Sequence, residues 1–237
     1  LPETFALFSA AKQLALGVDE SFGAARVQEF LRQQAIANKL WIVAGTLPLA
    51  SAIDSRRVRS ACLVFDDCGE LRARYDKIHL FDVDVADKQG SYRESDTFEP
   101  GSEVVVLDSP VGRLGLAVCY DLRFPELFRL MFEQGVDVIV VPSAFTLATG
   151  EAHWLALLRA RAIENQCYVV GVNQGGRHSA SRVTSGGSAI IDGWGRVLAE
   201  AGRGEACLVS AVDLPALAQW RLDMPIAAHR RFGVIKK

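Results

Sequence analysis

The stretch 113–127, RLGLAVCYDLRFPEL, places one cysteine, Cys119, where an apolar run gives way to a turn. The apolar run is typical of a buried strand, and the Phe-Pro-Glu-Leu that follows predicts the start of a helix. A thiol with a pKa of ~8.5 is mostly protonated at neutral pH, so it needs a nearby base or positive charge to act as a nucleophile. Cys119 is therefore either an ordinary core cysteine or a nucleophile presented at a strand-to-helix turn.

Two charged residues elsewhere in the chain supply the complementary chemistry. Lys77 ends the second strand of a predicted hairpin in RARYDKIHL, and Glu3 precedes the apolar Phe5-Ala6-Leu7. A carboxylate can accept the thiol proton, whereas an ammonium group can lower the thiol pKa and stabilise an oxyanion. Chemistry alone does not select these two from 28 acidic and 26 basic residues. Each one by itself is an ordinary charge at the end of a strand or of the chain.

Histidine and metal chemistry are the alternatives. A pair of Cys119 with His79 or His153 is the main rival to the carboxylate and ammonium set, which we favour. The segment 82–90, DVDVADKQG, is rich in carboxylates, but Ala86 and Asp87 stand where an EF-hand loop needs an oxygen ligand and a glycine. We find no cysteine and histidine spacing of the zinc type, so we predict no metal and no organic cofactor.

The composition of the 237 residues favours one domain, 1–237, with a substantial core, because half of the residues are hydrophobic. The net charge of -2 shows no basic excess for nucleic acid, and no apolar run reaches the ~18 residues of a membrane span. The first residues lack the features of a signal peptide. Five widely spaced cysteines indicate free thiols and a cytoplasmic location, with Cys62, Cys167 and Cys207 in the core and Cys68 at an exposed turn.

Hairpins and crossover units alternate along the chain, which predicts an α/β fold with mixed sheets. The first part predicts a helix over 21–38, with Ser21 or Asp19 as its cap, a strand over 41–49, hairpins over 60–80 and 102–121, and a loop over 82–102. The second part predicts helices over 125–134 and 153–166, strands over 136–144, 167–174 and 205–214, a loop over 175–187, a hairpin over 188–201 and a short final helix.

Three motifs together resemble the nitrilase, or carbon–nitrogen hydrolase, superfamily: LPETFAL, YDKIHLFDVDV and GLAVCYDLRFPELFR. The later segment VPSAFTLATGEAHWLALLRARAIENQCYVVGVNQ and the C-terminal HRR are similar to the Nit branch, which holds omega-amidases and deaminated-glutathione amidases. The resemblance covers nearly the whole chain. It implies a four-layer α-β-β-α sandwich and pairing into a homodimer or higher oligomer, with the region 220–232 at the interface.

The resemblance also implies a role for each candidate residue. Glu3 matches the general base, Lys77 the lysine, Cys119 the nucleophile and Glu94 a second glutamate in the loop after the lysine, while the backbone amide of Tyr120 matches the oxyanion donor. The family places a strand and a helix before the Pro-Glu, and these are missing from this sequence. Without them we expect the first sheet to lose a strand and Glu3 to stand on an untethered terminus.

The reaction that this resemblance implies is hydrolysis of a small, carboxylate-bearing primary amide, with release of ammonia through a thioester. We expect Arg123, Phe145, Thr146 and Arg177 to bind the substrate, with Arg123 or Arg177 meeting its carboxylate; Arg123 is otherwise a structural partner of Glu126. Because ENQCYVV followed by QGGRH is similar to deaminated-glutathione amidases, deaminated glutathione is the preferred substrate. The alternatives are an omega-amidase acting on 2-oxoglutaramate, an N-carbamoyl amidase, a nitrilase, or a non-catalytic binding protein.

Overall fold

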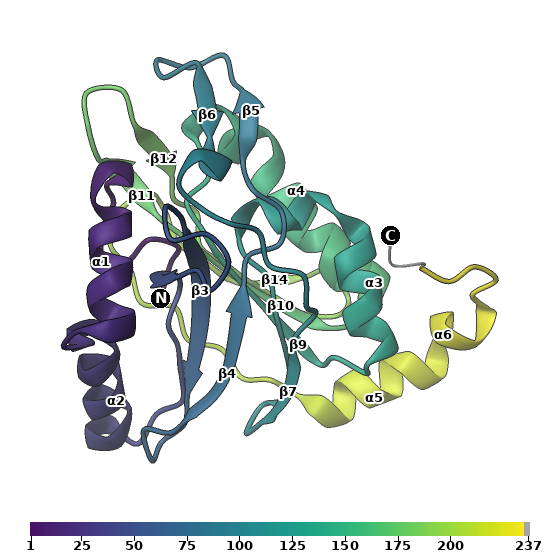
Figure 1. Ribbon diagram of the computed structural model, residues 1–237. Helices are drawn as coiled ribbons and strands as arrows, with labels where there is room; N and C mark the ends of the chain where they lie inside the picture. Colours follow the sequence, from purple (N-terminus) through teal and green to yellow (C-terminus); the bar gives the residue numbers. More distant parts are fainter. Residues whose placement is uncertain (235–237) are drawn as a thin grey trace.

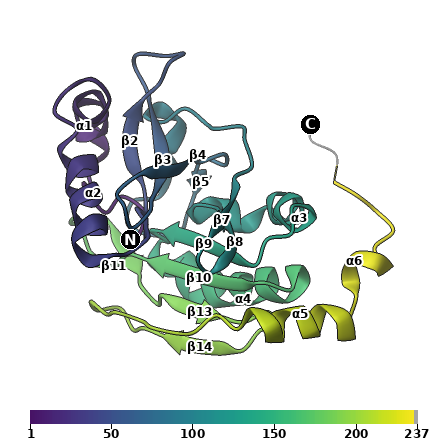
Figure 2. The same ribbon diagram turned by 90° about the horizontal axis from the view of Figure 1, so that it is seen from below.

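Two β-sheets lie face to face between two pairs of helices in the computed structural model, which describes residues 1–234 (Figures 1 and 2). The helices α1 (Ala10–Phe22) and α2 (Arg26–Asn38) cover the outer face of the first sheet. The helices α3 (Pro125–Glu133) and α4 (Leu147–Asn165) cover the outer face of the second. This arrangement confirms the predicted mixed α/β fold with its four layers.

The first sheet is built around β3 (Val58–Phe65), which pairs antiparallel with β4 (Leu71–Asp76) along one side. Along its other side lie β1 (Ile42–Val43) and β2 (Leu47–Ala50), where the sequence predicted one strand over 41–49. The strand is interrupted at Gly45, which has a left-handed φ of 44°. A Cβ atom at Gly45 would lie 1.9 Å from the carbonyl oxygen of Pro2, so only glycine lets the N-terminal segment pass here.

Alternation along β3 explains why this sheet is buried on both faces. Leu63 and Phe65 pack with Leu31 of α2, whereas Cys62 and Val64 belong to the core between the two sheets. That core extends through the second sheet to the inner faces of α3 and α4.

The second sheet has six strands in the order β14-β13-β10-β9-β8-β7. Its centre is parallel, with β8 (Gly112–Leu116), β9 (Val138–Ser143) and β10 (Tyr168–Asn173) side by side, as the predicted βαβ alternation requires. The antiparallel strands β7 (Val106–Ser109), β13 (Ala189–Ile191) and β14 (Val197–Glu200) complete the predicted hairpins.

The helices differ from the prediction mainly at the N-terminal side. Two helices, α1 (Ala10–Phe22) and α2 (Arg26–Asn38), replace the single helix over 21–38, because Gly23 and the left-handed Ala25 break the chain between them. Ser21 is thus no cap: it lies in α1, and its hydroxyl accepts a hydrogen bond from the Ala50 amide of β2. The helices α3 (Pro125–Glu133) and α4 (Leu147–Asn165) confirm the later predictions, although α4 begins earlier than expected.

Two segments predicted as loops each contain a short hairpin. One pairs β5 (Asp82–Asp84) with β6 (Ser91–Arg93) and leads into the 3₁₀ turn η1 (Glu94–Asp96), and the other pairs β11 (Gly175–Arg177) with β12 (Val183–Ser185). Both hairpins stand at the same end of the molecule (Figure 1). Each of their strands has three residues, too few for an alternating pattern to distinguish a strand from a loop.

The C-terminal part contains α5 (Leu214–Asp223), which packs on the core through the buried Leu217, and α6 (Ile226–His229), which extends away from the two sheets (Figures 1 and 2). The predicted strand over 205–214 is wrong, because this segment pairs with no strand of the described chain. Cys207 is consequently exposed rather than in the core, whereas Cys62 and Cys167 are buried and Cys68 is exposed, as predicted. No helix among residues 1–234 combines the length and the apolar character that crossing a membrane requires.

Candidate active site

A cavity of about 310 Å³ opens at the end of the molecule where the two hairpins stand, a volume at the lower limit of small-ligand pockets. It is lined by every predicted site residue except one: Glu3, Lys77, Glu94, Cys119, Tyr120, Arg123, Phe145 and Thr146. The fold therefore brings together side chains that lie far apart in the sequence.

Cys119 begins the 3₁₀ turn η2 (Cys119–Arg123), which Ala117 and Val118 separate from the end of β8. Its φ of 48° is left-handed, a conformation that costs energy for any residue other than glycine. Pro125 then opens α3 at a position where its missing N–H costs nothing. The chain thus makes the sharp strand-to-helix turn that the sequence indicated, with the cysteine at its strained point.

The fully buried carboxylate of Asp121 holds this turn in place. Its Oδ2 accepts hydrogen bonds from the Val118 amide at 2.8 Å and from the Tyr75 hydroxyl at 2.7 Å. Its Oδ1 lies 3.0 Å from the His79 amide and 2.7 Å from His79 Nδ1. His79 thus binds Asp121 through both its amide and its ring, and the ring stacks on Phe124. His79 does not line the cavity.

His153 does not line the cavity either; its Nδ1 lies 3.2 Å from an Arg123 nitrogen. A dyad of Cys119 with His79 or His153 therefore has no support in the geometry.

Lys77 is the buried cation of the site, with 1% of its surface exposed. Its Nζ lies 2.8 Å from Glu3 Oε1 and 2.9 and 2.8 Å from the two carboxylate oxygens of Glu94. Burial alone would lower the pKa of Lys77, but the two carboxylates outweigh it and raise this pKa well above its ordinary value. The side chain is therefore an ammonium group fixed between two carboxylates.

Glu94 opens η1, which follows the β5–β6 hairpin. Its Oε2 also accepts a hydrogen bond of 2.6 Å from the Phe81 amide. Burial and the neighbouring Glu3 raise the pKa of Glu94, although Lys77 acts in the opposite direction. Since both oxygens of Glu94 bind Lys77, this carboxylate fixes the position of the ammonium group.

The Cys119 side chain is held as a neutral thiol. Burial and the Glu3 carboxylate raise its pKa well above the ordinary value, and they outweigh the opposite effects of Lys77 and the Ala144 amide. A thiol beside a carboxylate has an acceptor for its proton at hand. The amide of Tyr120, in the first turn of η2, donates to no other group in residues 1–234 and so remains available to a ligand.

Glu3 is fixed from both sides despite its place near the first residue described. The Glu3 carbonyl accepts hydrogen bonds from the Thr4 hydroxyl at 2.7 Å and from Gln174 Nε2 at 3.1 Å. The Thr4 amide donates to Thr46 Oγ1 at 2.8 Å, and Thr4 itself is left-handed. These contacts contradict the expectation of an untethered glutamate.

The other predicted residues also line the cavity: Phe145 and Thr146 are buried, and Arg123 is partly exposed. The Arg123 guanidinium lies 5.9 Å from the Tyr120 ring centroid and 5.4 Å from that of Phe145, and it forms no ion pair with Glu126 in the described chain. Thr146 caps α4 and contacts Thr149, which also lines the cavity.

Arg177 is the exception among the predicted residues. It is exposed on β11 and bonds the Ala180 carbonyl, so its predicted place in the pocket is wrong.

Several lining residues had no signal in the sequence, among them Phe8, Tyr92, His178 and Arg182. Phe8 precedes α1, which the sequence did not predict, and the other three lie in the two hairpins expected to be loops. His178 stacks on Phe8 with ring centroids 3.9 Å apart. Prediction of these contacts requires the tertiary arrangement of three separate segments.

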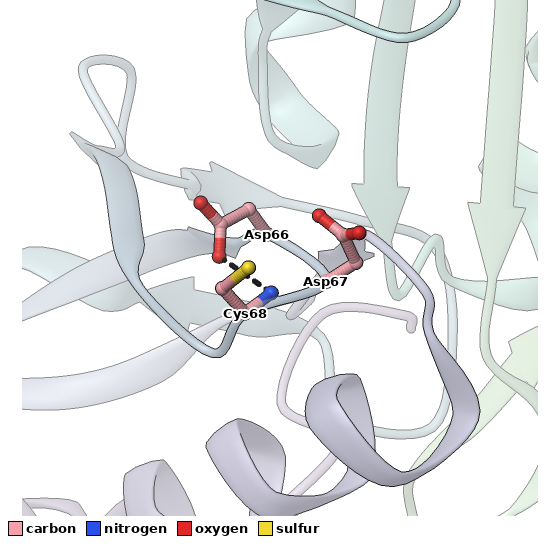
Figure 3. A group of neighbouring side chains, drawn as sticks. All are labelled: Asp66, Asp67 and Cys68. Carbon is pink, nitrogen blue, oxygen red and sulfur yellow. Dashed lines mark hydrogen bonds between the residues drawn. The ribbon is translucent and has the colours of Figure 1, made fainter.

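A second cluster of polar side chains lies at the β3–β4 turn, where Asp66, Asp67 and Cys68 have potential metal-ligating atoms within 4.8 Å of one another (Figure 3). The turn itself explains the cluster. Asp66 Oδ1 accepts hydrogen bonds from the amides of Cys68 and Glu70, and its other oxygen lies 3.7 Å from Arg72. The cluster stabilises a hairpin turn, far along β3 from the cavity.

Comparison with known proteins agrees with this geometry. The carbon-nitrogen hydrolase family matches residues 1–222. The chain is 47% identical over 206 residues to a deaminated glutathione amidase of Yersinia enterocolitica, covering 87% of this chain and 72% of that protein. It is 40% identical over 192 residues to the omega-amidase NIT2 of Homo sapiens, covering 81% and 68% of the two chains.

Among solved structures, Nit3 of Saccharomyces cerevisiae, a member of branch 10 of the nitrilase superfamily, has a TM-score of 0.85 and 30% identity. The match covers 98% of this chain and 82% of the yeast chain. These matches confirm the resemblance that the sequence motifs indicated. The chain belongs to the carbon-nitrogen hydrolase family.

Proposed function

We propose that this enzyme hydrolyses a carboxylate-bearing amide through a thioester on Cys119. One observation carries the proposal: a buried thiol, a carboxylate and an ammonium group meet in one cavity on a strained turn. The raised pKa of Cys119 favours proton transfer to Glu3 as the sulfur attacks, rather than a thiolate formed beforehand. Family membership and the amidase names of the relatives support the same reaction class.

The first half of the reaction forms the sulfur–carbon bond. Glu3 accepts the Cys119 proton, and the carbonyl oxygen of the amide becomes an oxyanion near the free Tyr120 amide and the Lys77 ammonium. One such donor is typically worth about 3 kcal/mol in the transition state. The carbon–nitrogen bond then breaks as Glu3 returns the proton to the leaving nitrogen, which leaves as a neutral amine or ammonia.

The second half hydrolyses the thioester. A water molecule loses a proton to Glu3 and attacks the acyl carbon, and the sulfur leaves as its proton returns from Glu3. Glu94 keeps Lys77 in position throughout, because both of its oxygens are bound to Nζ. The sum of the two halves is an amide plus water giving an acid plus an amine.

Deaminated glutathione is the substrate we propose, on the support of the 47% identical relative with that name. Arg123 at the cavity mouth supplies a cation for one substrate carboxylate. The γ-amide of this tripeptide-like molecule is secondary, so its hydrolysis releases the amine of cysteinylglycine. Ammonia is released only from primary amides such as 2-oxoglutaramate. For deaminated glutathione, the expected product is therefore cysteinylglycine and not ammonia.

The test is turnover of a panel of amides, combined with intact-mass measurement of the enzyme. The panel contains deaminated glutathione, 2-oxoglutaramate, succinamate and neutral acetamide. We expect highest kcat/KM for deaminated glutathione, and an acyl adduct on a peptide containing Cys119 after rapid acid quenching. Turnover of 2-oxoglutaramate in preference to deaminated glutathione would favour the omega-amidase alternative. No turnover of any of the four amides would contradict the proposal.

We also propose that the enzyme forms a homodimer through its C-terminal region. Leu222, Met224 and Phe232 are exposed by 73%, 44% and 88%, which is costly for side chains of this size in water. We expect light scattering of the wild type to give twice the mass of one chain. The double variant Leu222→Glu, Phe232→Glu should give the mass of one chain. A monomer at micromolar concentration would contradict this.

A cytoplasmic location completes the proposal. All five cysteines are free, including the exposed Cys68 and Cys207, which is typical of a reducing compartment. Cell fractionation with an antibody to the protein tests this expectation.

A further inference from the structure

Arg182 forms part of the cavity wall that is built by the two hairpins and by Phe8. It directly precedes β12, and its guanidinium carbon lies 4.6 Å from the Tyr92 ring centroid and 5.6 Å from that of Phe8. One nitrogen, Nη2, donates to the Ala144 carbonyl at 3.2 Å. These neighbours fix the planar group in the wall, as aromatic faces commonly do for arginine.

The other terminal nitrogen, Nη1, is buried and has no hydrogen-bond partner among residues 1–234. A buried N–H group without an acceptor is costly and is rare in folded proteins. Arg161 shows the usual arrangement, because its three nitrogens all bond the Leu122 carbonyl or Glu164. The other two unpaired buried atoms of the described residues belong to Asn165 and Arg230, neither of which lines this cavity.

The charge of Arg182 is also incompletely matched. No carboxylate of the described chain forms an ion pair with it, and Asp87, whose pKa its charge lowers, is bound by the Tyr92 hydroxyl at 2.7 Å. A guanidinium with a spare donor in a pocket wall is suited to a ligand carboxylate, which accepts from its nitrogens in one plane.

Arg123 occupies a different part of the cavity. It lies against Tyr120 and Phe145 beside His153, whereas Arg182 lies against Tyr92 and Phe8. The two cations share no ring neighbour. A substrate with two separate carboxylates therefore has a different cation for each of them.

We propose that Arg182 binds a second substrate carboxylate, distinct from the one that Arg123 meets, and so selects amides with a carboxylate on the leaving-group side. This rests on the proposed function. Deaminated glutathione has two carboxylates, one on its acyl half and one on the glycine of its leaving half. 2-Oxoglutaramate has the same acyl half and lacks the second carboxylate, so the two substrates form a matched pair.

The test compares both substrates on the intact enzyme and on Arg182→Leu. We expect KM for deaminated glutathione to rise about tenfold or more, with kcat and the KM for 2-oxoglutaramate within about twofold of the wild type. Arg182→Lys keeps the charge and should show a smaller rise. Arg177→Leu, on the same hairpin but outside the cavity, is the control and should change neither KM. Equal changes for both substrates, or none, would overturn the inference.

A binding measurement separates this inference from the reaction itself. Calorimetry with deaminated glutathione on Cys119→Ala, with and without Arg182→Leu, needs no turnover. We expect about tenfold weaker binding when Arg182 is replaced. If the wild type hydrolyses no amide but this loss appears, the proposed function fails and the inference stands. If the wild type hydrolyses both substrates and Arg182→Leu leaves the affinity for deaminated glutathione unchanged, the inference alone fails. If Cys119→Ala does not bind deaminated glutathione, the inference is also contradicted.

Discussion

The two walls of the cavity satisfy their polar groups in opposite ways. On the wall of Lys77, every carboxylate and the ammonium group are bound to one another or to backbone amides at 2.6–2.9 Å. On the wall of the hairpins, Arg182 retains a buried nitrogen without a partner among residues 1–234. Arg123, in a different part of the cavity, lies against two aromatic rings and His153. The charges of the first wall, Glu3, Lys77 and Glu94, have partners without a ligand, whereas Arg182 of the hairpin wall, the second wall, has a nitrogen that only a ligand can pair.

This difference follows from what each wall has to do. A reacting group must be in place before the substrate arrives, because reorganisation during the reaction adds to the barrier. A recognition group gains binding energy only from bonds that it has not already made within the protein. Changes on the first wall should therefore affect kcat and stability, and changes on the second should affect KM.

Cys119→Ser should produce the largest effect. The serine hydroxyl is a far weaker nucleophile beside a carboxylate alone, so we expect kcat to fall by about 10³-fold or more while the melting temperature changes little. Cys207→Ser, at the exposed cysteine, is the matched control and should keep full activity. Turnover near that of the wild type in Cys119→Ser would remove this sulfur from the mechanism.

Lys77→Met should destabilise the first wall as well as stop the reaction. It leaves Glu3 and Glu94 buried together with no cation, which typically costs about 3–5 kcal/mol of unfolding free energy. Urea unfolding measures this loss. Adding Glu94→Gln to Lys77→Met removes one of the two charges and should restore part of the stability but none of the activity. If the double variant is less stable than the single one, charge repulsion is not the cause.

Asp121→Asn tests whether the turn around Cys119 must be fixed. An amide offers one acceptor oxygen, where the carboxylate now accepts from Val118, Tyr75 and His79. We expect a loss of about 1–3 kcal/mol in stability and a fall in kcat with KM nearly unchanged. Tyr75→Phe, which removes one donor and keeps the acid, should have a smaller effect on both. A change confined to KM would place Asp121 in substrate recognition instead.

The sequence predicted the first wall much better than the second, and the reason is physical. Cys119 follows the apolar run of β8, and Lys77 directly follows β4, in which apolar and charged residues alternate. Both patterns are local signatures of a strand, and they place the residue that follows at a sheet edge. The second wall depends on hairpins whose strands have three residues each and on α1, and none of these segments has a decisive local pattern.

Arg177 and Arg182 show the consequence within one hairpin. Both are arginines in GGRHSASR. Arg182 lines the cavity beside Phe8, whereas Arg177 is exposed on β11, where it pairs with Val183 of β12. When residues come together only through the tertiary structure, their spacing in the sequence follows no regular pattern, so it does not predict the contact.

The smallest effect should come from Arg123→Leu, at the mouth of the cavity. Arg123 is partly exposed at the cavity mouth, so water screens its charge and a ligand carboxylate gains less than it would from a fully buried partner. We expect KM for anionic amides such as succinamate to rise about three- to tenfold, with kcat unchanged and KM for neutral acetamide unaffected. Arg177→Leu again serves as the control, because it removes an exposed arginine that does not touch the cavity. If Arg123→Leu instead lowers kcat equally for neutral and anionic amides, then Arg123 supports the turn that carries Cys119, and the division of the cavity into a reacting wall and a recognition wall does not hold at its mouth.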